Sequence, residues 1–276
     1  MTGRSASARP GPRLPLPDVK RLLGLVLGLL PMVAGEALAD GKETLDAARA
    51  AYYSLRREGL ASFSCLATPN WDAILAARRR TDPVAAEKTY KVLSALTFGV
   101  EVAPGQRAKV MHTEPPSTSE KEAEGLKLVT SGVEKTLSGF FDAWAPFVAT
   151  SPIPPATAEV VEAHDLWNVD YKEGSLRIGL VMRKDLTIDL MHLVTASFDS
   201  VVQPQFIKSP KGLLLTAVQG QYRQLPTGPL GSLQLRIEYQ DVTGFMLPKH
   251  LYVSSNDGRA VTLMDLSFGT CQAQRR

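Results

Sequence analysis

Hydrophobic and polar positions follow two different periods in the two halves of the chain. Up to about residue 148, apolar residues recur mainly every three or four positions, which places them on one face of a helix. From about residue 158 onward, apolar and polar residues mainly alternate, the pattern of strands that bury one face. The chain is therefore predicted to be α+β, with most helices first and one large antiparallel sheet after them.

The first half is predicted to contain four helices and three short strands. The predicted helices cover residues 41–59, 71–80, 83–97 and 119–148, and the predicted strands cover residues 60–68, 98–102 and 107–112. Asp82 before Pro83 is a typical N-cap followed by proline at the first helical position.

Three glycines recur every seven residues in the longest predicted helix, at Gly125, Gly132 and Gly139. Glycine inside a helix costs about 1 kcal/mol relative to alanine, so this repeat needs a reason. Either this face of the helix packs closely against another element, or the helix is irregular or broken near Gly125.

The second half is predicted to contain about eight strands between Ala158 and Cys271. Turn signals such as Glu173-Gly174 and Asn256-Asp257-Gly258 separate the alternating runs, and most connections are short. A meander with one apolar face needs a cover, so the long helix and its neighbours are expected to lie across the sheet.

The N-terminal segment is typical of an export signal. Five basic residues precede an apolar run from Leu22 to Leu30, and Ala37-Leu38-Ala39 forms a small-x-small cleavage pattern before Asp40. The run is shorter than the roughly 20 apolar residues that span a membrane. We expect residues 1–39 to be a cleaved signal peptide, with an uncleaved N-terminal anchor as the alternative, and residues 40–276 to be one exported domain.

Charge argues against a nucleic-acid surface. The full chain has 31 Lys and Arg against 28 Asp and Glu, and residues 1–39 hold five and two of these, which leaves 26 of each sign. The sequence pI near 8.8 therefore reflects the leader. We interpret the basic run Arg78–Arg80 as a solvated helix end, and we expect no nucleic-acid partner.

No motif in the sequence announces a catalytic chemistry or a cofactor. The chain lacks the G-x-S-x-G, P-loop and G-x-G-x-x-G patterns. None of the histidines, at positions 112, 164, 192 and 250, has a metal-ligand spacing to another histidine or a carboxylate. His192 could serve as a ligand or base in a cavity, although a strand-end histidine bonded to backbone is the more common case. We expect no enzyme, no metal and no cofactor.

The two cysteines, Cys65 and Cys271, lie in the first predicted strand and just after the last. An even count in an exported protein favours a disulfide, which would join the two ends of the sheet. Two separate buried thiols are the alternative.

The apolar face of the predicted sheet is the remaining candidate for a binding site. Either it is ordinary core, or the sheet curves around a cavity that holds an apolar ligand. The candidate residues, together with Trp144 of the long helix, are Leu176, Ile178, Leu180, Leu186, Ile188, Leu190, Leu213, Leu215, Leu233, Leu235 and Ile237.

Three segments resemble the periplasmic lipoprotein carriers of the LolA/LolB-like superfamily. They are the helix and strand from Leu45 to Cys65, the run SPKGLLLTAVQGQ from Ser209, and LRIEYQDVTGFMLPKHLYV from Leu235. The last contains a Y-x-x-V-x-G-x-x-L-P pattern, which starts at Tyr239 and ends at Pro248. The resemblance implies an incomplete, strongly curved barrel plugged by helices, and binding of lipid or acyl chains. The helical block at about 71–148 is longer than expected for these carriers, and no functional residue can be carried over.

Three functions are compatible with these observations. The first is an exported, periplasmic or secreted, non-enzymatic carrier of a lipid or of the acyl chain of a lipoprotein, with at most transient membrane association. The second is an envelope-assembly or interaction scaffold with a solid core and no cavity. The third is a hydrolase assembled from distant segments, which would require histidine and acidic groups that meet in a cleft.

Overall fold

The computed structural model describes residues 37–115, 119–258 and 261–276, which belong to one compact unit. The predicted leader lies outside the described residues, apart from positions 37–39 at the start of the first helix. The described part contains four helices: α2 (Ala37–Ala51), α3 (Trp71–Thr81), α4 (Pro83–Leu93) and α5 (Glu120–Val148). None of these helices is both long enough and apolar enough to cross a membrane.

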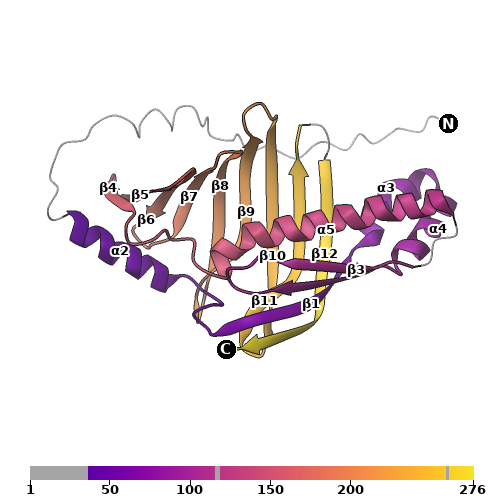
Figure 1. Ribbon diagram of the computed structural model, residues 1–276, viewed down its shortest axis with the longest axis horizontal. Helices are drawn as coiled ribbons and strands as arrows, with labels where there is room; N and C mark the ends of the chain where they lie inside the picture. Colours follow the sequence, from indigo (N-terminus) through magenta and orange to yellow (C-terminus); the bar gives the residue numbers. More distant parts are fainter. Residues whose placement is uncertain (1–36, 116–118, 259–260) are drawn as a thin grey trace, which may run out of the picture. The chain divides into compact units, whose positions relative to one another are not determined.

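Twelve strands form a single antiparallel sheet that does not close on itself (Figure 1). The first three are β1 (Leu60–Pro69), β2 (Thr97–Val102) and β3 (Lys109–Thr113). Nine follow α5: β4 (Glu159–Ala163), β5 (Leu166–Glu173), β6 (Leu176–Arg183), β7 (Ile188–Val194), β8 (Phe198–Ser209), β9 (Gly212–Gln224), β10 (Leu230–Val242), β11 (Phe245–Asn256) and β12 (Val261–Arg275). The predicted class, α+β with a large antiparallel sheet, is confirmed.

The sheet is a meander, and its first strand in the sequence pairs with its last strand in the middle of the sheet. Its strand order is β3-β2-β1-β12-β11-β10-β9-β8-β7-β6-β5-β4. Strand β1 pairs along its length with β12, and the predicted disulfide between Cys65 and Cys271 joins these same two strands. The pairing places β3 and β4 at the two open edges of the sheet.

Helix α5 crosses one face of the sheet, which we call the inner face. Its residues contact successive strands: Phe147 lies against Phe206 of β8, and Phe140 lies against Phe268 of β12. At its midpoint, Glu134 bonds His112 of β3. In Figure 1 the helix passes in front of β9–β12, as these contacts require.

Helix α2 is joined to the same sheet by two buried tyrosines that follow it. The Tyr52 hydroxyl donates to the Leu186 carbonyl at 2.9 Å and accepts from the Ile188 amide at 2.8 Å. The Tyr53 hydroxyl accepts from the Met246 amide at 2.9 Å. Burial raises the pKa of Tyr53 to about 12, so its hydroxyl stays neutral. The chain after α2 is thus fixed to both β7 and β11.

The helix predicted over residues 41–59 ends early, at Ala51. Tyr52 forms a parallel β-bridge with Leu213, and the Tyr53 amide donates to the Leu213 carbonyl at 2.9 Å. Backbone pairing with β9 therefore replaces the last predicted helical turns. No local sequence pattern predicts this pairing. The predicted end at Gly59 survives only as a turn residue with a positive φ of 84°.

The other predicted helices are confirmed within a few residues. Helix α3 keeps its span, and α4 ends at Leu93. Asp82 caps α4 as predicted, with its carboxylate accepting from the Ala85 amide at 2.9 Å.

The three heptad glycines lie on the exposed side of an unbroken α5, so neither interpretation of them is confirmed. A Cβ atom built on Gly125, Gly132 or Gly139 would meet no described atom within 4 Å beyond the local helix backbone. The helix continues without a break from Glu120 to Val148.

Removing the disulfide should destabilise the protein, because the bridge closes a loop of 206 residues. We expect the double variant Cys65→Ser/Cys271→Ser to lose about 2–5 kcal/mol of unfolding free energy. Denaturant unfolding of the variant and of the oxidised wild type measures this loss. Thiol labelling of the unfolded, unreduced protein should detect no free cysteine, and labelling of both cysteines would contradict the bridge.

Replacing Tyr52 by phenylalanine should also destabilise the fold. The Ile188 amide and the Leu186 carbonyl would both lose their tyrosine partner in a buried position, at a cost of about 2 kcal/mol. The control is Tyr252→Phe on β11, because the Tyr252 hydroxyl has no hydrogen bond among the described residues and the side chain is 36% exposed. Equal losses in urea unfolding would show that the Tyr52 hydroxyl carries no special role.

Candidate functional site

Side chains of α5 fill the space between this helix and the sheet. Phe140, Phe141 and Trp144 are buried and pack against one another, with ring centroids of Phe140 and Phe141 4.7 Å apart. Phe63 of β1 and Phe268 of β12 complete the cluster. This part of the inner face is a packed aromatic core.

The Trp144 indole reaches across to a half-buried tyrosine of β10. Its Nε1 donates to the Tyr239 hydroxyl at 3.1 Å. Burial raises the pKa of Tyr239 well above its usual range, so the hydroxyl stays neutral. In the described part, no buried side-chain nitrogen or oxygen lacks a partner. The polar groups of this core are therefore satisfied without a ligand.

Most residues predicted to line an apolar site belong to the core. Three others, Ile178, Leu186 and Leu233, are half-buried and pack against it, whereas Leu176 and Leu190 lie outside it. The fully buried ones are Trp144, Leu180, Ile188, Leu213, Leu215, Leu235 and Ile237.

A β-bulge explains why Leu190 does not share a face with Ile188, contrary to the alternation in the sequence. Val181 pairs with Leu190, but the next residue, Met182, pairs with Ile188, so Asp189 is the extra residue. Leu190 consequently faces the outer side of the sheet. Leu186 is not in the strand at all, because it sits in the preceding turn with a φ of 67°.

One row of half-buried side chains continues the inner face beyond the core. The sheet register places Tyr171, Ile178, Leu193 and Tyr222 on the same face, one row away from the buried residues Leu180 and Met191. Leu176 and Phe198 flank this row at the strand ends, and the rings of Phe198 and Tyr222 stack at 5.9 Å. We call these six side chains the inner strip. None of these six residues is fully buried. The row crosses five strands, from β5 to β9, and its position on β8, between Leu193 and Tyr222, is the buried polar residue Ser200.

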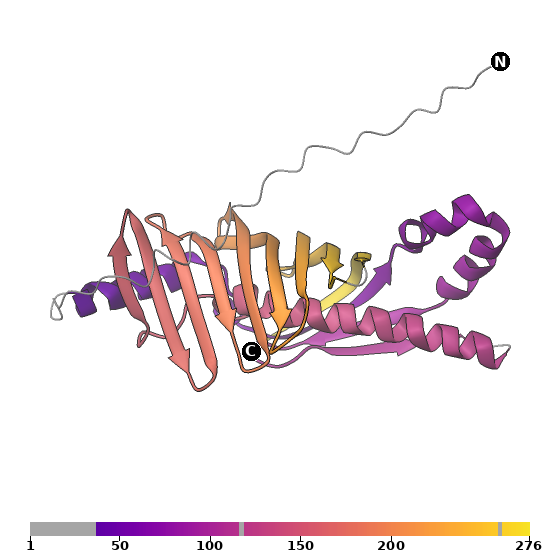
Figure 2. The same cartoon turned by 90° about the horizontal axis from the view of Figure 1, so that it is seen from above.

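Neither helix covers the inner strip. Helix α2 begins beside the strip, where Gly41 approaches Val160 in the row of Leu180 and Met191. The residues after α2 contact the opposite end of these strands, where Tyr52 bonds Leu186. Helix α5 ends against β8 and β9, and the ends of β8–β10 near the β9–β10 turn project beyond it in Figure 1. Figure 2 shows α2 and α5 behind the strands β4–β9, on the same side of the sheet.

Of the inner strip, only Leu176 and Ile178 were among the residues predicted to line an apolar site. Leu193 was missed because the bulge at Asp189 reverses the phase of β7. Tyr171 and Tyr222 lie in strongly polar segments, and only their cross-strand partners reveal that they face inward.

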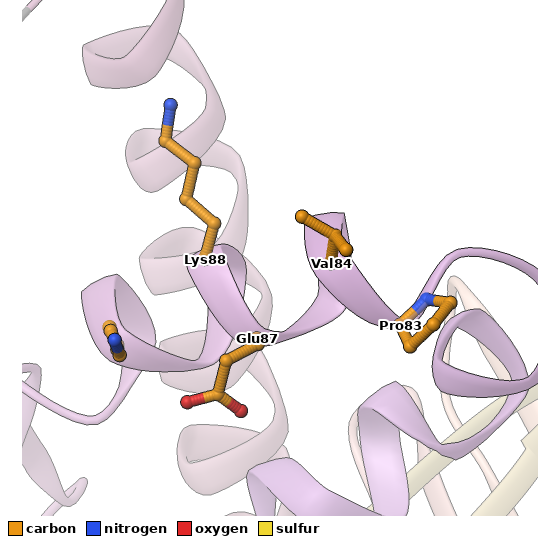
Figure 3. A pocket seen from close by; sticks show the side chains of 5 residues that line it. Pro83, Val84, Glu87 and Lys88 are labelled. Atoms are coloured by element: carbon orange, nitrogen blue, oxygen red, sulfur yellow. The ribbon is translucent and has the colours of Figure 1, made fainter.

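Two open depressions of the described part lie elsewhere. One is on the surface of α4, lined by Pro83, Val84, Glu87, Lys88 and Lys91 (Figure 3). The other lies over β8–β11 and is lined by Gln205, Thr216, Ala217, Arg236, Ile237, Glu238 and His250. Both are open, and neither lies between α5 and the sheet.

Three of the four histidines meet carboxylates in space, although none does so in sequence. His192 pairs with Asp199 at 2.9 Å on the outer face, so it is bonded to a side chain and not to the backbone. His250 pairs with Asp265 at 2.5 Å and lines the depression over β8–β11. In the described residues, no group of three or more His, Cys, Asp or Glu side chains is placed to hold a metal ion.

The His250 pair has a structural task. Asp265 also accepts from the Asn70 side-chain amide at 3.0 Å, and Asn70 is the N-cap of α3. The Asn70 backbone amide in turn donates to the Asp265 carbonyl at 2.8 Å. The network therefore attaches the start of α3 to β12, and this explains the pairing of His250 without any reaction.

His112 forms a clamp between the edge strand β3 and α5. Its Nδ1 lies 2.6 Å from a carboxylate oxygen of Glu134, and its Nε2 lies 3.1 Å from one of Glu114. Both ring nitrogens can donate only when the imidazole is protonated. The hydrogen bond to Glu134, with that to Glu114, raises the pKa of His112. Thr130 of α5 also donates to Glu114, at 3.2 Å.

No family model, curated protein or solved structure matches this chain.

The His112 clamp should hold α5 against β3 more firmly at acidic pH. A pKa raised by folding gives stability that is complete below the unfolded value, near 6.5, and is lost as pH rises through the higher folded value. We expect His112→Gln to lose about 1 kcal/mol at pH 5.5 and much less at pH 8.5. Hydrogen exchange of α5 amides, compared between wild type and variant at each pH, measures the difference.

His192→Gln is the matched control for the clamp, because its partner Asp199 lies on the neighbouring strand β8. This variant should leave α5 exchange unchanged. A loss in His112→Gln that stays constant with pH would show that protonation of His112 does not hold the helix.

Proposed function

We propose that this chain is an exported, non-enzymatic binding protein that carries an apolar chain, such as a lipid or the acyl chain of a lipoprotein, on the inner strip. The observation that carries the proposal is the strip itself. It is a mainly apolar surface, interrupted on β8 by Ser200, on the face where the rest of the sheet is buried under helices, and neither helix covers it.

The dimensions of the inner strip suit an elongated apolar ligand. Adjacent strands are about 4.8 Å apart, so the four spacings from β5 to β9 give about 19 Å. A hydrocarbon chain laid along this row would bury apolar surface at about 25 cal/mol per Å² on each partner. The hydroxyls of Tyr171 and Tyr222 are the polar tips of the row, and that of Tyr171 donates to Glu173 at 2.7 Å. A ligand with an apolar body and a polar end fits this arrangement.

The sequence supports the same class of function. The disulfide fits an oxidising compartment, in line with the predicted leader and a periplasmic location. An open sheet with helices on one face is also the layout of an incomplete barrel, as the resemblance to the periplasmic lipoprotein carriers implies. The ligand, however, would lie on an open strip and not in an enclosed cavity under α5.

A scaffold function is the second candidate, and the aromatic core favours it. Trp144, Phe140 and Phe141 are buried between α5 and the sheet, and the depressions on α4 and over β8–β11 lie outside this interface. In that case the inner strip would receive a protein partner in place of a lipid. The two functions share the surface and differ in the chemistry of the occupant.

A charge on the inner strip should abolish binding of apolar ligands. We expect Leu193→Glu to weaken binding of a fluorescent fatty-acid probe by at least about tenfold, because the carboxylate would be desolvated by the ligand. The control is Leu190→Glu, which lies in the same strand on the outer face and should bind like wild type. Fluorescence titration measures affinity, and native mass spectrometry detects copurified lipid.

Two results would overturn the carrier proposal. One is a wild-type protein that binds no probe and copurifies with no apolar ligand, which would favour the scaffold function. The other is an equal loss in the two variants, which would show that the inner strip is not the site.

A further inference from the structure

Helices α3 and α4 form a basic hairpin that stands beside the sheet and not across it (Figures 1 and 2). Between Trp71 and Leu93 the chain carries five basic and three acidic residues. Trp71 and Leu75 are buried in the core at the start of the hairpin, and the hydrogen bonds between Asn70 and Asp265 attach this start to β12. The turn between the two helices, at Asp82, is exposed.

Two of the three acidic residues of the hairpin already have partners within it. Asp72 pairs with Arg79 at 2.5 Å, and Arg79 also lies over the Tyr90 ring at 5.1 Å. Asp82 caps α4. Four cations have no ion pair in the part of the chain that the structure describes: Arg78, Arg80, Lys88 and Lys91.

The most exposed large apolar side chain of the described residues sits among these cations. Val84 is 81% exposed and begins the first turn of α4. Lys88 and Lys91 follow it at i+4 and i+7, which places them on the same helical face. Figure 3 shows Val84 and Lys88 projecting to one side of α4 and the acid Glu87 to another, although Glu87 lines the same open depression as these residues and Lys91.

We propose that the α3–α4 hairpin docks on the surface of an anionic lipid membrane. Val84 would enter the headgroup region, and Lys88 and Lys91, which share its face of α4, would pair with lipid phosphates. From the sequence alone, the run Arg78–Arg80 is typical of a solvated helix end. The structure adds the lysines and the exposed valine, and these change the interpretation.

An anionic bilayer fits this surface because the surface combines an apolar tip with unpaired positive charge. Interfacial helices bury their apolar face at the headgroup boundary and surround it with lysine and arginine. Each basic residue near an anionic membrane surface contributes roughly fivefold in affinity. An acidic protein surface would pair with these cations equally well, but it would not explain why an apolar side chain, Val84, is exposed beside them.

Vesicle binding tests the proposal on the purified protein. Vesicles of phosphatidylcholine alone are compared with vesicles that contain equal parts of phosphatidylcholine and phosphatidylglycerol. We expect cosedimentation with the anionic vesicles only, and its loss at high salt, because surface charges are then screened. The variant Lys88→Gln/Lys91→Gln should bind about 25-fold more weakly, and Val84→Asp should also weaken binding.

Matched controls separate the hairpin from general surface effects. Lys208→Gln/Lys249→Gln removes two exposed lysines of the sheet, and Ile207→Asp charges an apolar side chain of β8 that is 51% exposed. Both controls should bind anionic vesicles like wild type. Circular dichroism and thermal unfolding confirm that each variant is folded before its binding is compared.

Three outcomes would overturn the docking proposal. They are equal binding to both kinds of vesicle, an equal loss in the controls, and binding to polyglutamate without binding to anionic vesicles, which would assign the hairpin to an acidic protein. The docking proposal does not depend on the carrier function. Leu193→Glu should leave vesicle binding intact, so failure of one proposal is distinguishable from failure of the other.

Discussion

The connection between β3 and β4 is the constraint on which the rest of the structure depends. Pairing of β1 with β12 places β3 and β4 at opposite edges of a twelve-stranded sheet, although β3 and β4 are consecutive strands in the sequence. The chain between them must therefore cross the sheet. Twelve strands are about 53 Å wide, and the 29 residues of α5 make a helix about 44 Å long. The second half of this helix, from Glu134 to Phe147, lies along the inner face between β3 and β8.

The aromatic core follows from that crossing. A helix laid over an apolar face must bury its own apolar side, and α5 does so with Phe140, Phe141, Trp144 and Phe147. The helix nevertheless ends against β8 and β9, so the strands toward β4 need another cover. Helix α2 has 15 residues, or about 22 Å, and it is tied by Tyr52 to one end of those strands. The other end stays open, and there the inner strip lies.

Local patterns were sufficient to predict the elements that depend on local forces. The alternation of β6, the apolar spacing of α5 and the cap at Asp82 are properties of short segments, and each has its predicted structure. The disulfide followed from the even cysteine count. The early end of α2 and the phase of β7 could not be predicted, because Tyr52 pairs with Leu213 and Asp189 bulges only in the context of neighbouring strands.

The candidate surfaces were harder to predict than the fold, for the same physical reason. Alternation shows that Leu180 and Leu193 belong to strands, but it does not show which end of a strand a distant helix covers. Likewise, a run of arginines has a different meaning when Val84 and Lys88 lie beside it on a second helix. Both surfaces therefore arise from non-local arrangement, and they lie on different parts of one hydrogen-bonded sheet: the inner strip on β5–β9, and the hairpin at the end of β1. Because the cations are remote from the strip, a membrane held by the hairpin would not neutralise or occupy the apolar surface, and a bound chain could remain on the strip while the protein rests on lipid.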